Sequence, residues 1–119
     1  MKIAITSTGA TLDAPMDPRF GRAAFILIVD TEGQVLEVLD NSENIRAFEG
    51  AGIQAATTIS DHGAEALLTG YCGPKAFKVL EAAGIRVAAD VSGSGREALA
   101  AFRVGKLPFI DAANAEAHW

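Results

Sequence analysis

The sequence has little of the chemistry that builds metal cages or disulfide frameworks: one cysteine and two histidines in 119 residues. A single cysteine cannot form an internal disulfide or a structural zinc site made of several thiolates. Neither His62 nor His118 has a cysteine or carboxylate at the spacing of a metal-binding motif. Because His62 directly precedes Gly63, we expect its imidazole to cap the last carbonyls of a helix.

Long apolar segments and a surplus of positive charge are also missing. No stretch reaches the roughly 20 apolar residues that span a bilayer, and the N-terminus moves directly into a strand pattern without a signal-like segment. The net charge of -5 disfavours general attraction to nucleic acid or anionic membrane, because both need Lys and Arg on the contact face. We therefore expect a cytoplasmic protein without nucleic acid or membrane as a partner.

Half of the residues are hydrophobic, and the length suits one domain with a substantial core. Alternating apolar patterns and turn residues predict three strands, the last two forming a hairpin, and then helices that alternate with short strands. In chain order, the expected elements are strands at 2–6, 23–30 and 34–40, a helix at 50–63, a strand at 64–69, a helix at 74–84, a strand at 85–88 and a helix at 94–105. No element is expected in 106–119.

This βββαβαβα order predicts an α/β sandwich of three layers, in which helices cover a mixed five-stranded sheet and right-handed crossovers join the later units. If the second strand runs antiparallel to the others, four connections meet at one end of the sheet: 7–22, 41–50, 70–75 and 90–96. Open α/β sheets bind ligands at the carboxyl ends of their strands.

One of these connections carries two arginines in an acidic protein. Arg19 and Arg22 lie in a loop held by Phe20 and Gly21, and planar guanidinium groups suit multivalent oxyanions or sulfur-rich anions. Salt bridges from the two arginines to Asp13 or Asp17 are the alternative interpretation.

Further candidates for holding an anion lie at helix starts. Gly50 and Gly52 open a helix with little bulk, which lets a ligand approach backbone amides, although a flexible helix start explains them equally well. The turn before the last helix offers Ser94 as N-cap and Arg96 as a cation, but it lacks the Walker lysine and the GxGxxG spacing.

Cys72 stands just before Gly73 at a predicted helix N-terminus. The helix dipole there favours a thiolate, which is a soft ligand for copper or a metal-sulfur cluster. The alternative is that a small residue simply packs in a strand-to-helix turn. Because Ser7 and Ser92 lack identifiable triad partners, a hydrolase has little support.

Several segments, taken together and in order, resemble the dinitrogenase iron-molybdenum cofactor biosynthesis family over nearly the whole chain. They are the residues at 2–5, Arg19-Phe20-Gly21-Arg22, and those at 50–56, 73–77 and 83–87. Small members of this family include orange proteins that carry a molybdenum-copper sulfide cluster. The resemblance implies ribonuclease-H-like topology and a single nitrogenase accessory factor-like domain at 1–105, with 106–119 as a C-terminal tail.

The resemblance also implies a function. We expect a non-enzymatic binder or carrier of a molybdenum-copper sulfide cluster, or of a related molybdenum-iron-sulfur cluster, with donor or acceptor proteins as partners. The expected binding residues are Arg19, Phe20, Gly21, Arg22, Gly50, Gly52, Cys72, Gly73, Ser94 and Arg96, with Cys72 as the candidate metal ligand.

One departure and one rival accompany this expectation. Many family members have His at the position of Arg19, so this chain loses a possible imidazole ligand and relies more on charge pairing. The rival is a small metal-dependent hydrolase or phosphate-binding enzyme. Nucleases of ribonuclease-H-like topology place an acidic metal ligand on the first strand, and residues 2–6 contain no carboxylate.

Overall fold

A computed structural model describes residues 1–42 and 50–115. The strands are β1 (Lys2–Ser7), β2 (Phe25–Asp30), β3 (Val35–Asp40), β4 (Ala66–Leu68) and β5 (Arg86–Ala88). The helices are α2 (Ala51–Asp61), α3 (Pro74–Ala82) and α4 (Gly95–Arg103). No helix in the described part of the chain is long and apolar enough to cross a bilayer.

The strands form one sheet in the order β3-β2-β1-β4-β5. β2 is antiparallel to both of its neighbours, whereas β1, β4 and β5 run parallel. The predicted hairpin, the mixed five-stranded sheet and its ribonuclease-H-like strand order are confirmed.

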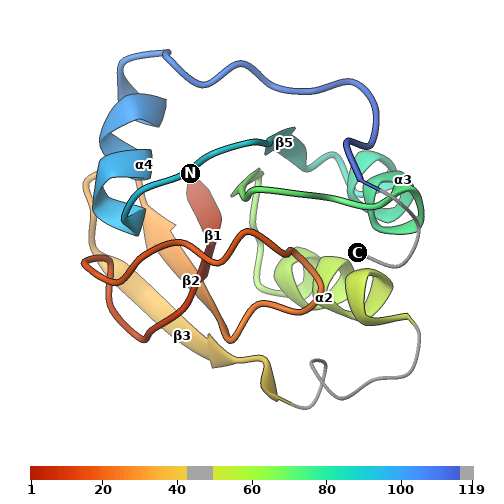
Figure 1. The fold of residues 1–119 in the computed structure, drawn as a ribbon, viewed down its shortest axis with the longest axis horizontal. Coiled ribbons are helices and arrows are strands. Elements are labelled where there is room, and N and C mark those ends of the chain that lie inside the picture. Colours follow the sequence, from red (N-terminus) through yellow and green to blue (C-terminus); the bar gives the residue numbers. More distant parts are fainter. Residues whose placement is uncertain (43–49, 116–119) are drawn as a thin grey trace.

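Helices cover both faces of this sheet, with α2 and α3 on one side and α4 on the other (Figure 1). Alternate residues of a strand point to opposite faces, which β1 shows clearly. Ala4 packs in the core beneath α2 and α3, whereas Ile3 and Ile5 pack in the core beneath α4. The two cores account for the predicted three layers.

The connections at the carboxyl ends of β1, β4 and β5 are hydrogen-bonded to one another. The backbone N–H of Met16 donates to Gly93 O at 2.8 Å, and that of Phe20 donates to Tyr71 O at 3.1 Å. The predicted meeting of the first, third and fourth connections is thus confirmed. Most of the remaining connection, residues 43–49, lies outside the described residues.

Residues 106–115 form no helix or strand of their own but pack closely on the domain. Figure 1 shows this dark blue segment running from α4 across to α3. Phe109 packs against the core beneath α4, and Ile110 packs against the opposite core, beneath α2 and α3. The segment pairs with the edge of the sheet, because the Ile110 N–H donates to Val87 O at 2.8 Å.

Candidate anion-binding site

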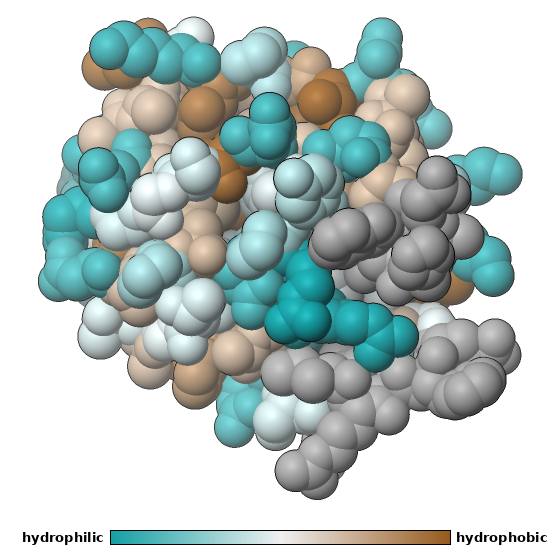
Figure 2. All heavy atoms as spheres, viewed as in Figure 1, coloured by the Kyte–Doolittle hydropathy of each residue, from teal (hydrophilic) through white to brown (hydrophobic). Residues whose placement is uncertain are grey.

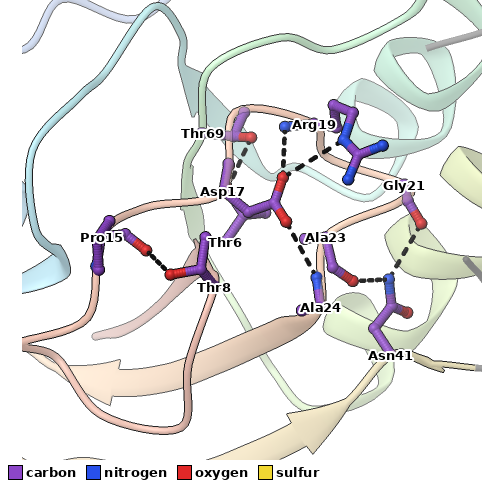
Figure 3. Close-up of polar contacts among 10 residues, drawn as sticks. All are labelled: Thr6, Thr8, Pro15, Asp17, Arg19, Gly21, Ala23, Ala24, Asn41 and Thr69. Atoms are coloured by element: carbon purple, nitrogen blue, oxygen red, sulfur yellow. Dashed lines mark hydrogen bonds and ion pairs between the residues drawn. The ribbon is translucent and has the colours of Figure 1, made fainter.

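The loop between β1 and β2 is organised by the carboxylate of Asp17, a residue only 5% exposed. Its Oδ1 accepts the backbone N–H of Arg19 at 3.1 Å, and its Oδ2 accepts that of Ala24 at 3.2 Å (Figure 3). The Arg19 Nε lies 3.6 Å from Oδ1, while the Arg19 side chain stays 46% exposed. The ion pair therefore orients a guanidinium group that remains accessible.

Asn41 holds the second half of this loop. Its Nδ2 donates to the carbonyls of Gly21 at 3.0 Å and Ala23 at 2.8 Å (Figure 3). These bonds hold the backbone around the half-buried Arg22 against the end of β3. Figure 2 shows the most hydrophilic side chains of this face gathered near its middle, where Figure 1 draws the orange loop.

Two glycines allow close packing here, one between the loop and the first turn of α2 and the other between the first turns of α2 and α3. A methyl group at Gly21 would lie 2.4 Å from the backbone nitrogen of Gly52, and one at Gly52 would lie 2.9 Å from Ala76 Cβ. The absence of a side chain at Gly52 thus lets α2 pack against α3. Neither ligand access nor a flexible helix start is needed to explain this glycine.

The N-terminal ends of α2 and α3 lack the usual intramolecular caps. Their N-cap residues, Gly50 and Gly73, have no side chain, and neither first turn contains an acidic residue. Gly50 has a φ of +80°, a left-handed conformation that glycine adopts without strain. Each helix N-terminus carries roughly half a positive charge, so two such partial charges lie beside the Arg19 loop.

Lys75 is a residue that the sequence argument missed. It is exposed in the first turn of α3, next to the N-cap Gly73. A cation in that position opposes the helix dipole, so it is unfavourable for the isolated helix. This local conflict was visible in the sequence and adds a fourth basic residue to the candidate set, after Arg19, Arg22 and Arg96.

The predicted residues of the last turn form a separate group. Ser94 caps α4 in a capping box: its Oγ accepts from the Glu97 N–H at 3.1 Å, and Glu97 Oε1 accepts from the Ser94 N–H at 3.0 Å. The Ser94 N-cap is therefore confirmed. Arg96 Nε donates to Asp13 Oδ1 at 2.8 Å, and this contact lowers the pKa of Asp13. Asp13, which the alternative interpretation paired with Arg19 or Arg22, is therefore paired with Arg96.

Cys72 and Phe20 point into the protein. Cys72 is 0% exposed and Phe20 is 1% exposed, and both belong to the core beneath α2 and α3. Burial raises the pKa of the Cys72 thiol to about 12. The expected thiolate is therefore wrong, because desolvation outweighs the helix dipole. Phe20 contributes as an anchor for the loop, since its ring cannot reach a ligand on the surface.

The expected capping role of the His62 imidazole is also wrong. Its Nδ1 contacts the Glu37 carboxylate of β3, an anionic partner that the fold places beside the end of α2. The capping bond at this end comes from the His62 backbone N–H, which donates to Thr58 O at 3.1 Å. His118 lies outside the described residues. Within residues 1–42 and 50–115, no group of three His, Cys, Asp or Glu side chains could hold a metal ion.

Comparison with known proteins identifies the family. The family model for dinitrogenase iron-molybdenum cofactor matches residues 1–105. The chain belongs to this family. The apo form of the orange protein from Desulfovibrio gigas has a similar structure, with a TM-score of 0.91 and 44% sequence identity over 96% of each chain.

Two more solved structures are similar to this family member. A Thermotoga protein placed in the DUF35 family is 34% identical over 97% of each chain, with a TM-score of 0.82. A protein from Methanocaldococcus jannaschii is 17% identical, and the match covers 94% of this chain and 96% of the Methanocaldococcus chain. Its TM-score of 0.67 shows a shared fold. A search of curated proteins gave no match.

Proposed function

We propose that this protein binds and carries an anionic molybdenum-containing metal-sulfur cluster, of the molybdenum-copper sulfide or the iron-molybdenum cofactor type. The cluster is cargo, and the protein catalyses no reaction on it. One observation carries the proposal: the accessible Arg19 guanidinium stands on a loop that packs against the first turn of α2 and is hydrogen-bonded to Tyr71, just before the N-cap of α3. Membership of the family and similarity to the orange protein support the choice of this class of anion.

The chemistry of this surface suits a large, diffuse anion. A sulfide cluster spreads its negative charge over several sulfur atoms, so it gains from several donors without requiring one strong ligand. Arg19, Arg22 and Lys75 supply cationic side chains, and the helix starts after Gly50 and Gly73 supply amides and dipoles. We expect the thiol of Cys72 to take no part in binding, because the residue is 0% exposed.

A carrier also needs proteins that load and unload it. We propose that such donor and acceptor proteins approach the face that bears the Arg19 loop, because the cargo is held there. A small phosphate-binding protein or hydrolase remains the competing function, since helix N-termini and arginines also suit phosphate. The two differ in ligand chemistry, because phosphate has no soft sulfur atoms and gives no visible absorption.

The test is reconstitution followed by competition. Apo protein is incubated with tetrathiomolybdate and a copper salt, and the product is passed through gel filtration. We expect charge-transfer bands to coelute with the protein at a near-stoichiometric molybdenum content. Excess inorganic phosphate should displace little of the cluster at constant ionic strength. Loss of molybdenum from folded protein would contradict the proposal, and displacement by low phosphate concentrations would favour the competing function.

A further inference from the structure

The segment from Gly70 to Gly73 is hydrogen-bonded along two edges. On one edge it pairs with the Arg19 loop: the Tyr71 N–H donates to Pro18 O at 2.6 Å, and Tyr71 O accepts from the Phe20 N–H at 3.1 Å. The contact with the loop is close, because a methyl group at Gly70 would lie 2.6 Å from Pro18 O. Any shift of this segment therefore moves the loop.

On the other edge, the Asp90 N–H donates to Gly70 O at 2.7 Å, and the remaining bonds come from one residue of the C-terminal segment, Asn114. Its Oδ1 accepts from the Cys72 N–H at 2.8 Å, and its Nδ2 donates to Gly70 O at 3.0 Å. Its own backbone N–H donates to Cys72 O at 3.2 Å. One asparagine thus bonds to both peptide groups that flank Tyr71, the residue whose backbone pairs with the loop.

The position of Asn114 is itself fixed by the packing of the residues before it. Ile110 is hydrogen-bonded to Val87 of β5, and Phe109 makes an edge-to-face contact with Phe102 of α4, with ring centroids 6.0 Å apart. The Arg86 guanidinium lies over the Phe109 ring, 4.5 Å from its centroid. These contacts hold residues 109–110 against the domain, and Asn114 follows four residues later along the same segment.

We infer that Asn114 is a positioning residue for the Arg19 loop, and that the C-terminal segment thereby completes the anion site without touching the anion. The role in binding rests on the proposed function. The mechanical link, by which Asn114 holds the Arg19 loop through the Gly70–Gly73 segment, does not. Because Asn114 carries no charge, its loss should disturb geometry and leave the electrostatic attraction intact. This separates it from the arginines, which contribute charge directly.

Amide hydrogen exchange in the free, full-length protein tests the mechanical link. In Asn114→Ala we expect exchange at Cys72, Tyr71 and Phe20 to accelerate about tenfold, as the loss of one or two hydrogen bonds predicts. Exchange in β1 should stay unchanged. Asn114→Asp keeps the acceptor for the Cys72 N–H but places an oxygen against Gly70 O, so it should restore protection at Cys72 without restoring the bond to Gly70. Ala112→Ser, at an exposed position in the same segment, is the control and should match the wild type.

Cluster binding tests the consequence for the site. With the tetrathiomolybdate and copper probe, Asn114→Ala should bind about fivefold to tenfold more weakly, with the same salt dependence as the wild type. Unchanged exchange at Phe20 and Tyr71 would overturn the inference, and so would faster exchange combined with wild-type affinity. If the wild type does not bind the probe, the proposed function fails, while the exchange data still decide the positioning role.

Discussion

Gly52 of α2 and Ala76 of α3 meet so closely that a methyl group on the glycine would lie 2.9 Å from the alanine Cβ. Both residues lie in the first turn of their helix, so the contact brings two helix N-termini together. Two aligned dipoles attract an anion more strongly than either does alone. The Arg19 loop touches the same first turn of α2 through Gly21, which adds full positive charge to the partial charges of the amides.

The first prediction concerns the share of affinity that comes from charge. Arg19→Ala should weaken cluster binding about tenfold, and the double change with Arg22→Ala about a hundredfold, because charge-assisted contacts contribute about 1.5 to 3 kcal/mol each. Added salt should weaken wild-type binding more than binding by the double variant. Titration of the cluster at low and high ionic strength measures both effects.

Arg96 supplies the matched control for that experiment. Replacing Arg96 removes the same charge as replacing Arg19. Arg96, however, is paired with Asp13 beside α4, on the opposite face of the sheet from α2 and α3. We expect Arg96→Ala to change cluster affinity by less than about threefold, since screening weakens interactions between distant surface charges. Equal losses from the Arg19 and Arg96 substitutions would mean that net charge alone attracts the cluster, without a defined site.

The second prediction follows from the buried thiol. The folded-state pKa of Cys72 is about 12, above its ordinary value of 9.0, so the unfolded chain loses its proton first. This contribution to stability is complete below about pH 9 and is lost as the pH rises toward 12, by about 1.4 kcal/mol per pH unit. Denaturant unfolding of the wild type and of Cys72→Ala should diverge across this range.

The difference between these two proteins isolates the thiol, because they share every other ionisable group. The wild-type free energy of unfolding should fall more steeply with pH than that of Cys72→Ala. Parallel curves would contradict the burial of the thiol. Cluster binding at neutral pH is a separate readout, and we expect Cys72→Ala to retain it; complete loss with normal circular dichroism would make Cys72 a direct ligand.

The sequence predicted the arrangement of the site better than its chemistry. The mixed sheet and its hairpin follow from hydrophobic periodicity and turn residues, whereas the strand order was implied by the family resemblance. With the second strand antiparallel, the meeting of the Arg19 loop with the turn at Cys72 could be inferred before any coordinates. The state of the Cys72 thiol depends on its burial in the core that it shares with residues of α2 and α3. The close packing of these two helices at Gly52 is visible only in the three-dimensional structure.

Ion pairs and hydrogen bonds between residues far apart in the chain could not be predicted from the sequence either. Asp13 and Asp17 were equivalent candidates for the loop arginines, yet Asp17 binds Arg19 and Asp13 binds Arg96, which lies 83 positions further along the chain. Asn114 stands in a segment without periodicity, and its bonds reach back 42 and 44 positions. Such contacts depend on the final placement of loops, for which local patterns carry no information.

The third prediction tests the contact between the loop and α2. Gly21→Ala places a methyl group within 2.4 to 2.8 Å of three backbone atoms of Ala51 and Gly52, which cannot move without disturbing the helix. We expect a loss of about 3 kcal/mol in the free energy of unfolding. Gly84→Ala is the comparison, because it has open space but a φ of +75°, and should cost only about 1 kcal/mol. A smaller loss at Gly21 than at Gly84 would count against the close packing.

The last prediction separates capping from anion binding at Ser94. Its hydroxyl already accepts the Glu97 N–H, so Ser94→Ala should lower the free energy of unfolding by about 1 kcal/mol and leave cluster affinity unchanged. Ser92→Ala, at an exposed position in the same turn, should change neither quantity. Thermal unfolding and cluster titration of the three proteins decide the matter. A tenfold loss of affinity in Ser94→Ala at full occupancy of the folded state would contradict a purely capping role for Ser94 and would couple this turn to the anion site, to which the Met16–Gly93 hydrogen bond already connects it.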